Sequence, residues 1–134
     1  MCGRITFLGS GAFAVAVFAL DQAAKAVLFS RGGVCNDMSA LGIVPIGTLS
    51  VLEFGIVAGL LFVAGWQMFR AANGPEACAW AAIVAGGVSN AADRIIFGCI
   101  RDVFPFFGVF LWNIADGAIV IGAAVLLWRI CKRD

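Results

Sequence analysis

Hydrophobic residues fall into four long segments along the chain, separated by shorter polar or glycine-containing stretches. The segments run from about Ile5 to Phe29, Ile46 to Phe69, Ala77 to Phe97 and Val109 to Ile130. Each has close to the roughly 20 apolar residues that an α-helix needs to cross a bilayer. The first is also too long to be a removable signal peptide. The pattern predicts an all-α membrane protein with four transmembrane helices, forming one domain over residues 1–134.

Three loops join the predicted helices, at Ser30–Pro45, Arg70–Glu76 and Gly98–Gly108. An even number of spans places both termini on one side of the membrane. Lysine and arginine divide five to four between the two sides, with Arg4, Arg70, Arg129, Lys132 and Arg133 beside the termini and Lys25, Arg31, Arg94 and Arg101 opposite. Because Lys and Arg are in excess in cytoplasmic loops, this count favours cytoplasmic termini.

Polar residues within the four segments gather near the face opposite the termini. They are Asp21, Glu53, Asn90, Asp93, Arg94, Asn113 and Asp116. An ionisable group in lipid costs about 2.5 kcal/mol or more, so such groups usually face the bundle interior and mark function. The alternative is that they only pair with one another, as Asp21 can with Lys25 at a spacing of four residues. Their position near one face favours a polar site, with the first and third loops opening onto it.

The composition fits lipid as the solvent and narrows the chemistry. With 63% hydrophobic residues and a mean hydropathy of +1.04, the chain has more apolar surface than a small soluble fold can bury. The net charge of +1 gives no indication of a nucleic-acid partner. The absence of His excludes Ser-His-Asp triads and His-ligated metals.

The cysteines do not have the spacing of a metal or redox motif. Cys2, Cys35, Cys78, Cys99 and Cys131 form no CxxC pair. We expect no metal or other cofactor, and we expect each cysteine to be a small buried apolar residue. Cys35 and Cys99 both fall on the face of the polar site, and the sequence leaves open whether they pair.

Paired aspartates are then the strongest candidate for catalysis. None of the serines has a lysine neighbour at helical spacing. Two carboxyl groups that share a site cannot easily both ionise, because the charge of one raises the pKa of the other. One can act as a general base on water while the other, protonated, polarises a scissile carbonyl.

Five motifs, in order along nearly the whole chain, carry a resemblance to a known family. They are DQAAK at Asp21–Lys25, NDMSALG at Asn36–Gly42, GGVSNAADR at Gly86–Arg94, GCIRDV at Gly98–Val103 and WNIAD at Trp112–Asp116. This series resembles the DQxxK, NxGxAFG, GGxxxNxxDR, GxVxDF and FNxAD segments of the bacterial lipoprotein signal peptidases (signal peptidase II). Those proteins are four-span aspartyl proteases of the cytoplasmic membrane.

The resemblance implies a catalytic dyad of Asp102 and Asp116. Supporting or substrate-contacting roles are implied for Asn36, Asn90, Asp93, Arg94, Asn113, Asp21 and Lys25. The helical spacing of Gly86, Asn90, Asp93 and Arg94 independently places these four residues on one stripe. Gly86 would allow close helix approach. For Asp93 the alternatives are direct catalysis, a polar helix contact, and a charge arrangement with Arg94 that fixes the geometry of the site.

The implied activity is an endopeptidase that removes the signal peptide from diacylglyceryl-modified prolipoproteins, cleaving just before the lipidated cysteine. We expect a multi-pass monomer in the bacterial inner membrane, with the prolipoprotein and membrane lipids as partners. The phenylalanines of the third loop are either a lipid-contacting cover or an ordinary aromatic belt.

The match departs from the family at Met38, Leu41, Val103 and Trp112, and only 14 positions separate Asp102 from Asp116. We expect activity with altered substrate tolerance, and Glu53 has no role in the family pattern. The alternatives are a small ion-coupled transporter using Glu53 or Asp21, a non-catalytic relative that binds lipidated peptides, and a structural bundle. A transporter would place its polar groups near mid-membrane rather than at one face.

Overall fold

The computed structural model describes residues 2–36 and 51–132, with side chains for residues 8–36 and 54–132. The chain is mostly helical, and its elements are α1 (Cys2–Leu28), a 3-10 turn η1 (Phe29–Arg31), β1 (Val34–Asn36), α2 (Val51–Arg70), α3 (Gly74–Phe97), β2 (Ile100–Asp102), β3 (Phe104–Phe106), β4 (Phe110–Trp112) and α4 (Ile114–Cys131). Met38, Leu41 and the side chain of Glu53 lie outside the described residues, so the expectations for them stay open.

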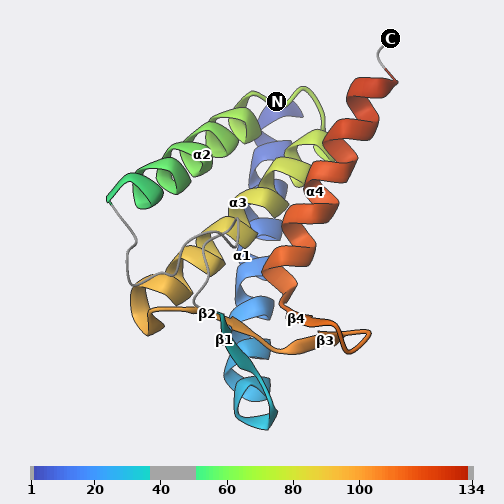
Figure 1. Ribbon diagram of the computed structural model, residues 1–134. Helices are drawn as coiled ribbons and strands as arrows, with labels where there is room; N and C mark the ends of the chain where they lie inside the picture. The colour runs from blue at the N-terminus through green and yellow to red at the C-terminus, as the bar shows by residue number, and fades with distance from the viewer. Residues whose placement is uncertain (1, 37–50, 133–134) are drawn as a thin grey trace.

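Helix α3 is the central element of the bundle and packs against α1, α2 and α4. The four short strands lie together at one end of the bundle, and the first turn of α1 and the last turn of α4 lie at the other (Figure 1). The chain therefore passes along the bundle four times, once in each helix.

The contact between α3 and α4 depends on small residues. The buried face of α3 toward its first half consists of alanines and Gly86. A Cβ atom on Gly86 would meet the carbonyl oxygen of Ala115, and one on Gly122 would lie 2.6 Å from the carbonyl oxygen of Ala79. Small residues let helix backbones approach closely within a membrane. The prediction that Gly86 allows close helix approach is confirmed.

We expect Gly122→Ala to destabilise the protein although Ala is a better helix former than Gly. The added methyl group has no space beside the Ala79 carbonyl, so α3 and α4 must move apart, at a cost of about 1–3 kcal/mol. Gly59→Ala on α2 is the matched control, because a Cβ there meets nothing within 4 Å. Thermal unfolding in detergent should show a lower midpoint for Gly122→Ala and an unchanged or higher one for Gly59→Ala. Equal midpoints would contradict this account of the contact.

The fourth helix begins later than the hydrophobic pattern predicts. It starts at Ile114 rather than near Val109, because Phe110–Trp112 pair with Phe104–Phe106 as antiparallel strands. Aromatic residues favour strands, and Phe107 and Gly108, with φ of 47° and 73°, form the turn between them. The predicted start of the fourth span near Val109 was therefore wrong by five residues. An apolar run alone does not distinguish a spanning helix from an aromatic hairpin that leads into one.

The first and third loops meet through a second strand pair, β1 with β2, and through a disulfide between Cys35 and Cys99. The expectation that every cysteine is a small buried residue was therefore wrong. Cys35 and Cys99 are bonded, Cys131 is exposed, and Cys78 is half-buried. The two cysteines that pair are 64 positions apart, so only the fold could establish that they meet.

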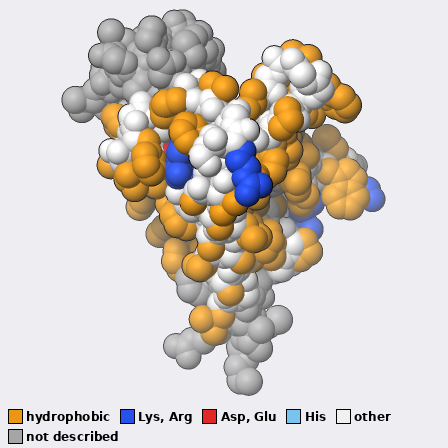
Figure 2. All heavy atoms as spheres, turned by 90° about the horizontal axis from the view of Figure 1, so that it is seen from below, with side chains coloured by type: hydrophobic (Ala, Val, Ile, Leu, Met, Phe, Trp, Pro, Cys, Tyr) orange, Lys and Arg blue, Asp and Glu red, His pale blue; other side chains and the backbone are white. Residues whose placement is uncertain are grey.

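Large apolar side chains cover the outside of the bundle. They include Leu60, Phe62, Val120 and Ile121, each more than 60% exposed. Within the described residues, two helical segments are long and apolar enough to cross a membrane, Leu8–Arg31 and Ile114–Cys131, and Phe54–Arg70 is a shorter apolar helix. At the strand end, hydrophobic side chains predominate with basic side chains among them (Figure 2). So much exposed apolar surface marks contact with lipid or another apolar partner.

Candidate active site

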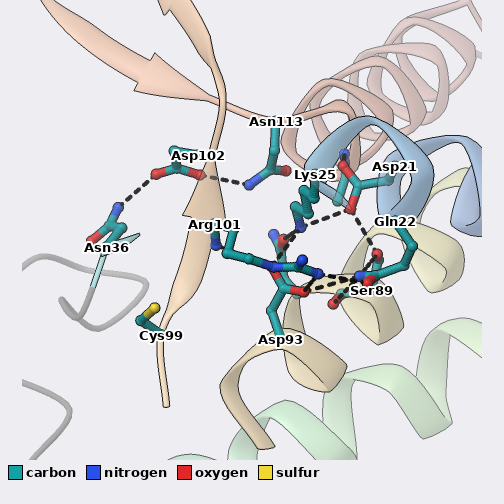
Figure 3. A network of polar contacts seen from close by, with 12 residues as sticks. Asp21, Gln22, Lys25, Asn36, Ser89, Asp93, Cys99, Arg101, Asp102 and Asn113 are labelled. Atoms are coloured by element: carbon teal, nitrogen blue, oxygen red, sulfur yellow. Dashed lines mark hydrogen bonds and ion pairs between the residues drawn. The ribbon is translucent and has the colours of Figure 1, made fainter. Parts of the chain in front are cut away.

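Asp102 is held in a buried position by two asparagines. It ends strand β2, all three residues of which are buried, and its own exposure is 5%. Asn36 Nδ2 donates to Asp102 Oδ2 at 3.1 Å, and Asn113 Nδ2 donates to Oδ1 at 2.7 Å. Figure 3 shows Asp102 between these two side chains. Each carboxyl oxygen therefore has one amide donor, which fixes the plane of the group.

Asp116 lies in the first turn of α4 and has its own amide donor. Asn90 Nδ2 donates to Asp116 Oδ1 at 2.8 Å. Lys25 Nζ donates to Asn90 Oδ1 at 3.1 Å, so the amide of Asn90 must present its NH₂ group to Asp116. The first turn of a helix also favours a negatively charged side chain. The side chain of Asp116 is thus held at the N-terminus of α4 by the amide of Asn90.

Asn113 connects the two aspartates. Its side-chain oxygen accepts from the backbone N–H of Asp116 at 2.9 Å and so caps α4. Asparagine is among the preferred residues at this position. Because the oxygen is used by the cap, the NH₂ group is directed to Asp102. One buried amide therefore sets the start of the helix that carries Asp116 and the orientation of Asp102.

Two cavities share three of their lining residues, Asp102, Asp116 and Asn36. One, of about 410 Å³, is also lined by polar residues of α3, including Asn90 and Arg94. The other, of about 440 Å³, is lined by aromatic residues of the β3–β4 hairpin and by α4. The two carboxyl groups therefore stand where two cavities meet. The first, which contains polar side chains of α3 among apolar residues, is called the polar cavity below, and the second the apolar cavity.

The surroundings of Asp102 shift its titration. Burial raises the pKa of the Asp102 carboxyl, and the negative charge of Asp116 adds to the rise. The hydrogen bonds from Asn36 and Asn113, together with the charge of Lys25, oppose it, but the pKa remains raised overall. A carboxyl group in this position stays protonated to a higher pH than an ordinary aspartic acid.

Beside the two aspartates lies a buried cluster of four charged side chains with no net charge. Lys25 Nζ is 2.7 Å from Asp21 and 3.1 Å from Asp93, and Arg101 Nη2 is 2.8 Å from Asp93. The pairing of Asp21 with Lys25 that their spacing predicted is confirmed. Figure 3 shows these groups converging from α1, α3 and β2.

The cluster also reaches the start of α4. Asp21 Oδ1 accepts from the backbone N–H of Ala115 at 2.8 Å, and Ala115 directly precedes Asp116. Ser89 Oγ donates to Asp21 Oδ2 at 2.7 Å. The carboxylate of Asp21 therefore joins α1 to α3 and to the turn that carries Asp116.

Arg101, Gln22 and Ser89 were absent from the predicted site, although they belong to this cluster. Arg101 Nη2 donates to Gln22 Oε1 at 2.8 Å, and Gln22 Nε2 donates to Asp93 and Ser89. Residues alternate between faces along a strand. The side chain of Asp102 points to the cavities, so that of its neighbour Arg101 points the other way, to Asp93 on α3. The signal that could have found them was their place in the motifs, where Gln22 lies beside Asp21, Ser89 beside Asn90 and Arg101 beside Asp102.

The polar residues of the stripe predicted on α3 lie in two different places: Asp93 in the ion cluster, and Asn90 and Arg94 at the cavity. Asp93 binds Lys25 and Arg101, so the predicted charge arrangement with its neighbour Arg94 is replaced by these two pairs. Arg94 instead lines the polar cavity together with Asn90, and its Nε has no hydrogen-bond partner within the described part of the chain. Among the same residues, no group of three or more Asp, Glu or Cys side chains is arranged to hold a metal ion.

The fold has counterparts among solved structures of bacterial membrane enzymes. One, determined by the in meso method at 2.3 Å, has a TM-score of 0.79 and 22% identity, covering 92% of this chain and 88% of the other. A second, at 1.9 Å, has a TM-score of 0.80 and 21% identity, covering 94% of both chains. The chain therefore has the fold of these helical membrane enzymes.

The sequence comparison identifies the family. The sequence model of the family described as signal peptidase (SPase) II matches residues 13–132. The chain belongs to the signal peptidase II family and is a membrane protein. The resemblance that the five motifs carry is confirmed at this level.

Similar proteins named lipoprotein signal peptidase come from several bacteria. That of Methylocella silvestris is 36% identical over 76 residues, covering 54% of this chain and 44% of the relative. That of Beijerinckia indica is 40% identical over 72 residues, covering 51% and 42%. That of a Synechocystis strain is 37% identical over 86 residues, covering 61% and 50%. The chain thus spans about half the length of the curated relatives it matches.

Proposed function

We propose that this chain is itself an aspartic endopeptidase that removes the signal peptide from diacylglyceryl-modified prolipoproteins. The observation that carries the proposal is the pair of Asp102 and Asp116 at the junction of two cavities, each with its own amide donor. Both aspartates come from one chain, so a monomer suffices for the site. The site needs no cofactor for this chemistry.

In the proposed mechanism the two carboxyl groups have different roles. Asp102, whose pKa burial raises, is the protonated partner and donates a hydrogen bond to the oxygen of the scissile carbonyl. Asp116, at a helix N-terminus, is the carboxylate that removes a proton from the attacking water. After hydroxide adds to the carbonyl carbon, the C–N bond breaks and Asp116 returns the proton to the leaving nitrogen. Asn90 and Asn113 keep the two groups in the required orientation.

The two cavities suit the two parts of a lipid-bearing peptide. The polar cavity, with Arg94 and Asn90, offers donors for peptide carbonyl oxygens. The apolar cavity between the hairpin and α4 is lined by Phe106, Phe110 and Trp112 and fits hydrocarbon. Phe107, 89% exposed at the hairpin tip, extends this apolar surface outward. Lipid contact is therefore the reading we favour for the aromatic residues of the third loop.

For the membrane arrangement, we infer four spans in the bacterial inner membrane, with the termini in the cytoplasm and the strands on the opposite face. Disulfides persist mainly in oxidising compartments, and Cys35–Cys99 lies at the strand end. Lys25 and Arg101 are buried in ion pairs, so they do not act as free loop charges on that side. The excess of Lys and Arg near the termini is therefore larger than the sequence count indicated.

Cleavage of a defined precursor by the purified wild-type protein tests this function. A diacylglyceryl-modified prolipoprotein and the same precursor without lipid are incubated with the protein in vesicles, and the products are analysed by mass spectrometry. We expect a product that begins at the lipid-bearing cysteine, formed from the modified precursor only. Binding of the modified precursor without cleavage would instead identify a non-catalytic relative and sink the proposal.

We expect the cleavage rate to fall as the pH rises through the pKa of Asp102, because only the protonated acid can donate to the carbonyl oxygen. Asn36→Ala removes a hydrogen bond that lowers this pKa. The fall in cleavage rate at alkaline pH, called the alkaline limb below, should therefore occur at higher pH in this variant than in the wild type. Asn73→Ala, which removes the cap of α3, is the matched control and should leave the limb in place. A limb that moves to lower pH in Asn36→Ala would contradict the assignment of Asp102 as the acid.

A further inference from the structure

The Cys35–Cys99 disulfide has no part in the proposed cleavage, yet it lies directly beside the site. Cys35 precedes Asn36, the donor to Asp102, and Cys99 precedes strand β2, which ends at Asp102. In the strand pair Cys35 lies opposite Arg101, and Asn36 lies opposite Ile100. The bond therefore fixes the strand that carries Asn36 to the strand that carries Asp102.

Burial does little to hold β1 in place. Val34 is 49% exposed and Cys35 is exposed, whereas every residue of β2 is buried. The ladder between them has three residue pairs, and a two-stranded pair of this length is marginal without further support. The disulfide closes a separation of 64 residues, so it removes much of the freedom that β1 would otherwise have.

We propose that the Cys35–Cys99 disulfide is a positioning element of the active site, which holds Asn36 against Asp102 and makes cleavage depend on the oxidised state of the pair. The inference rests on the proposed peptidase function. Without the bond, β1 leaves β2 for part of the time and takes the Asn36 amide with it. The buried Arg101 and its contacts with Asp93 hold β2 itself in place.

The exposure of Cys35 makes the bond accessible to a thiol reductant. The thiolate of dithiothreitol attacks one sulfur and releases the other cysteine as a thiol. The second thiol of dithiothreitol then attacks the mixed disulfide and releases the first cysteine. Two electrons and two protons pass to the protein, which gains two thiols, while the reductant becomes a cyclic disulfide. The lipidated cysteine of the substrate is a thioether and does not react.

A change in pH dependence separates positioning from general destabilisation. The hydrogen bond from Asn36 lowers the pKa of Asp102, so its loss raises that pKa and moves the alkaline limb of cleavage to higher pH. Within the part of the chain that the structure describes, the charged groups that act on Asp102 or line its cavity are Asp116 on α4, Lys25 on α1 and Arg94 on α3. None of these described groups is on β1, so a shift that Asn36→Ala reproduces reports the position of Asn36.

The experiment compares oxidised and dithiothreitol-reduced protein in detergent, with thiol alkylation and mass spectrometry to confirm the state of each cysteine. Cleavage of the modified precursor is followed across pH for the wild type, Cys35→Ser, Asn36→Ala and the control Cys78→Ser/Cys131→Ser. For the wild type we expect reduction to lower the maximal cleavage rate by roughly 10- to 100-fold and to move the alkaline limb to higher pH. Reoxidation should reverse both changes. Cys35→Ser should resemble the reduced wild type, and the control should respond to reduction as the wild type does.

In Asn36→Ala the rate is already low and the limb already raised, so reduction should change neither. The proposal is overturned if the reduced wild-type protein keeps its cleavage rate and its alkaline limb, or if Asn36→Ala loses as much rate on reduction as the wild type. It is also overturned if thermal unfolding shows that the reduced protein is unfolded, since the fall in rate then has another cause. Absence of cleavage by the oxidised wild type would instead refute the peptidase function.

Discussion

Asp102→Asn and Asp116→Asn are each expected to reduce cleavage of the modified precursor by about 10²–10⁴-fold or more. The first variant removes the acidic proton that polarises the carbonyl, and the second removes the base that activates water. Asparagine keeps the size of the side chain, and its one amide oxygen can still accept from one neighbouring amide, so both variants should fold. The rates should be measured as single turnovers with saturating protein, so that the result concerns chemistry rather than product release.

The matched control for these variants is Asp134→Asn, which makes the same chemical change in the C-terminal residue. It should cleave at the wild-type rate. Thermal unfolding of all the variants should show similar midpoints, since neither Asp102 nor Asp116 belongs to the buried ion cluster. Cleavage within tenfold of the wild-type rate by a folded Asp102→Asn or Asp116→Asn protein would exclude that residue from the chemistry.

Lys25→Met is expected to lower the free energy of unfolding by about 3–5 kcal/mol, because it leaves two buried carboxylates with one cation. In the wild type, Lys25 contacts both Asp21 and Asp93 with no exposure to solvent. Methionine fills a similar volume, so loss of packing contributes little. Thermal unfolding in detergent, with tryptophan fluorescence as the signal, measures the change.

Two further variants make this prediction specific. Arg31→Met removes an exposed charge near the same end of α1 and should change the stability by less than about 0.5 kcal/mol. Adding Asp21→Asn to Lys25→Met restores the charge balance, so the double variant should be more stable than Lys25→Met alone. If Lys25→Met unfolds at the same temperature as Arg31→Met, the cluster does not stabilise the fold as its burial indicates.

The helices and the polar end of the bundle were predictable because they depend on local sequence. A long apolar run defines a helix that can span lipid, and the depth of Asp21, Asn90 and Asp116 along their runs placed them together. The motif at Gly86–Arg94 placed Asn90 one turn beyond a glycine that allows close packing. These features need only helical geometry and the alternating direction of the spans.

The missed features depend on contacts between distant segments. The Cys35–Cys99 bond and the contacts of Gln22 and Ser89 require knowing which loop ends and helix faces meet. The hairpin before α4 was missed because its aromatic residues are as apolar as a span. Arg101 was read as a loop charge, since only the pairing of β2 directs it toward Asp93. Its burial is therefore a consequence of the strand, which the apolar pattern did not predict.

The most direct test of the central claim, that Asp102 and Asp116 act as one catalytic unit, is a double-mutant cycle on cleavage. Single-turnover rates are measured for the wild type, Asp102→Asn, Asp116→Asn and the double variant in the same vesicles. Two groups that work as a unit are strongly non-additive, so the double variant should be no slower than the slower single variant. Multiplication of the two single effects, or measurable cleavage at near wild-type rate by the double variant, would contradict the dyad.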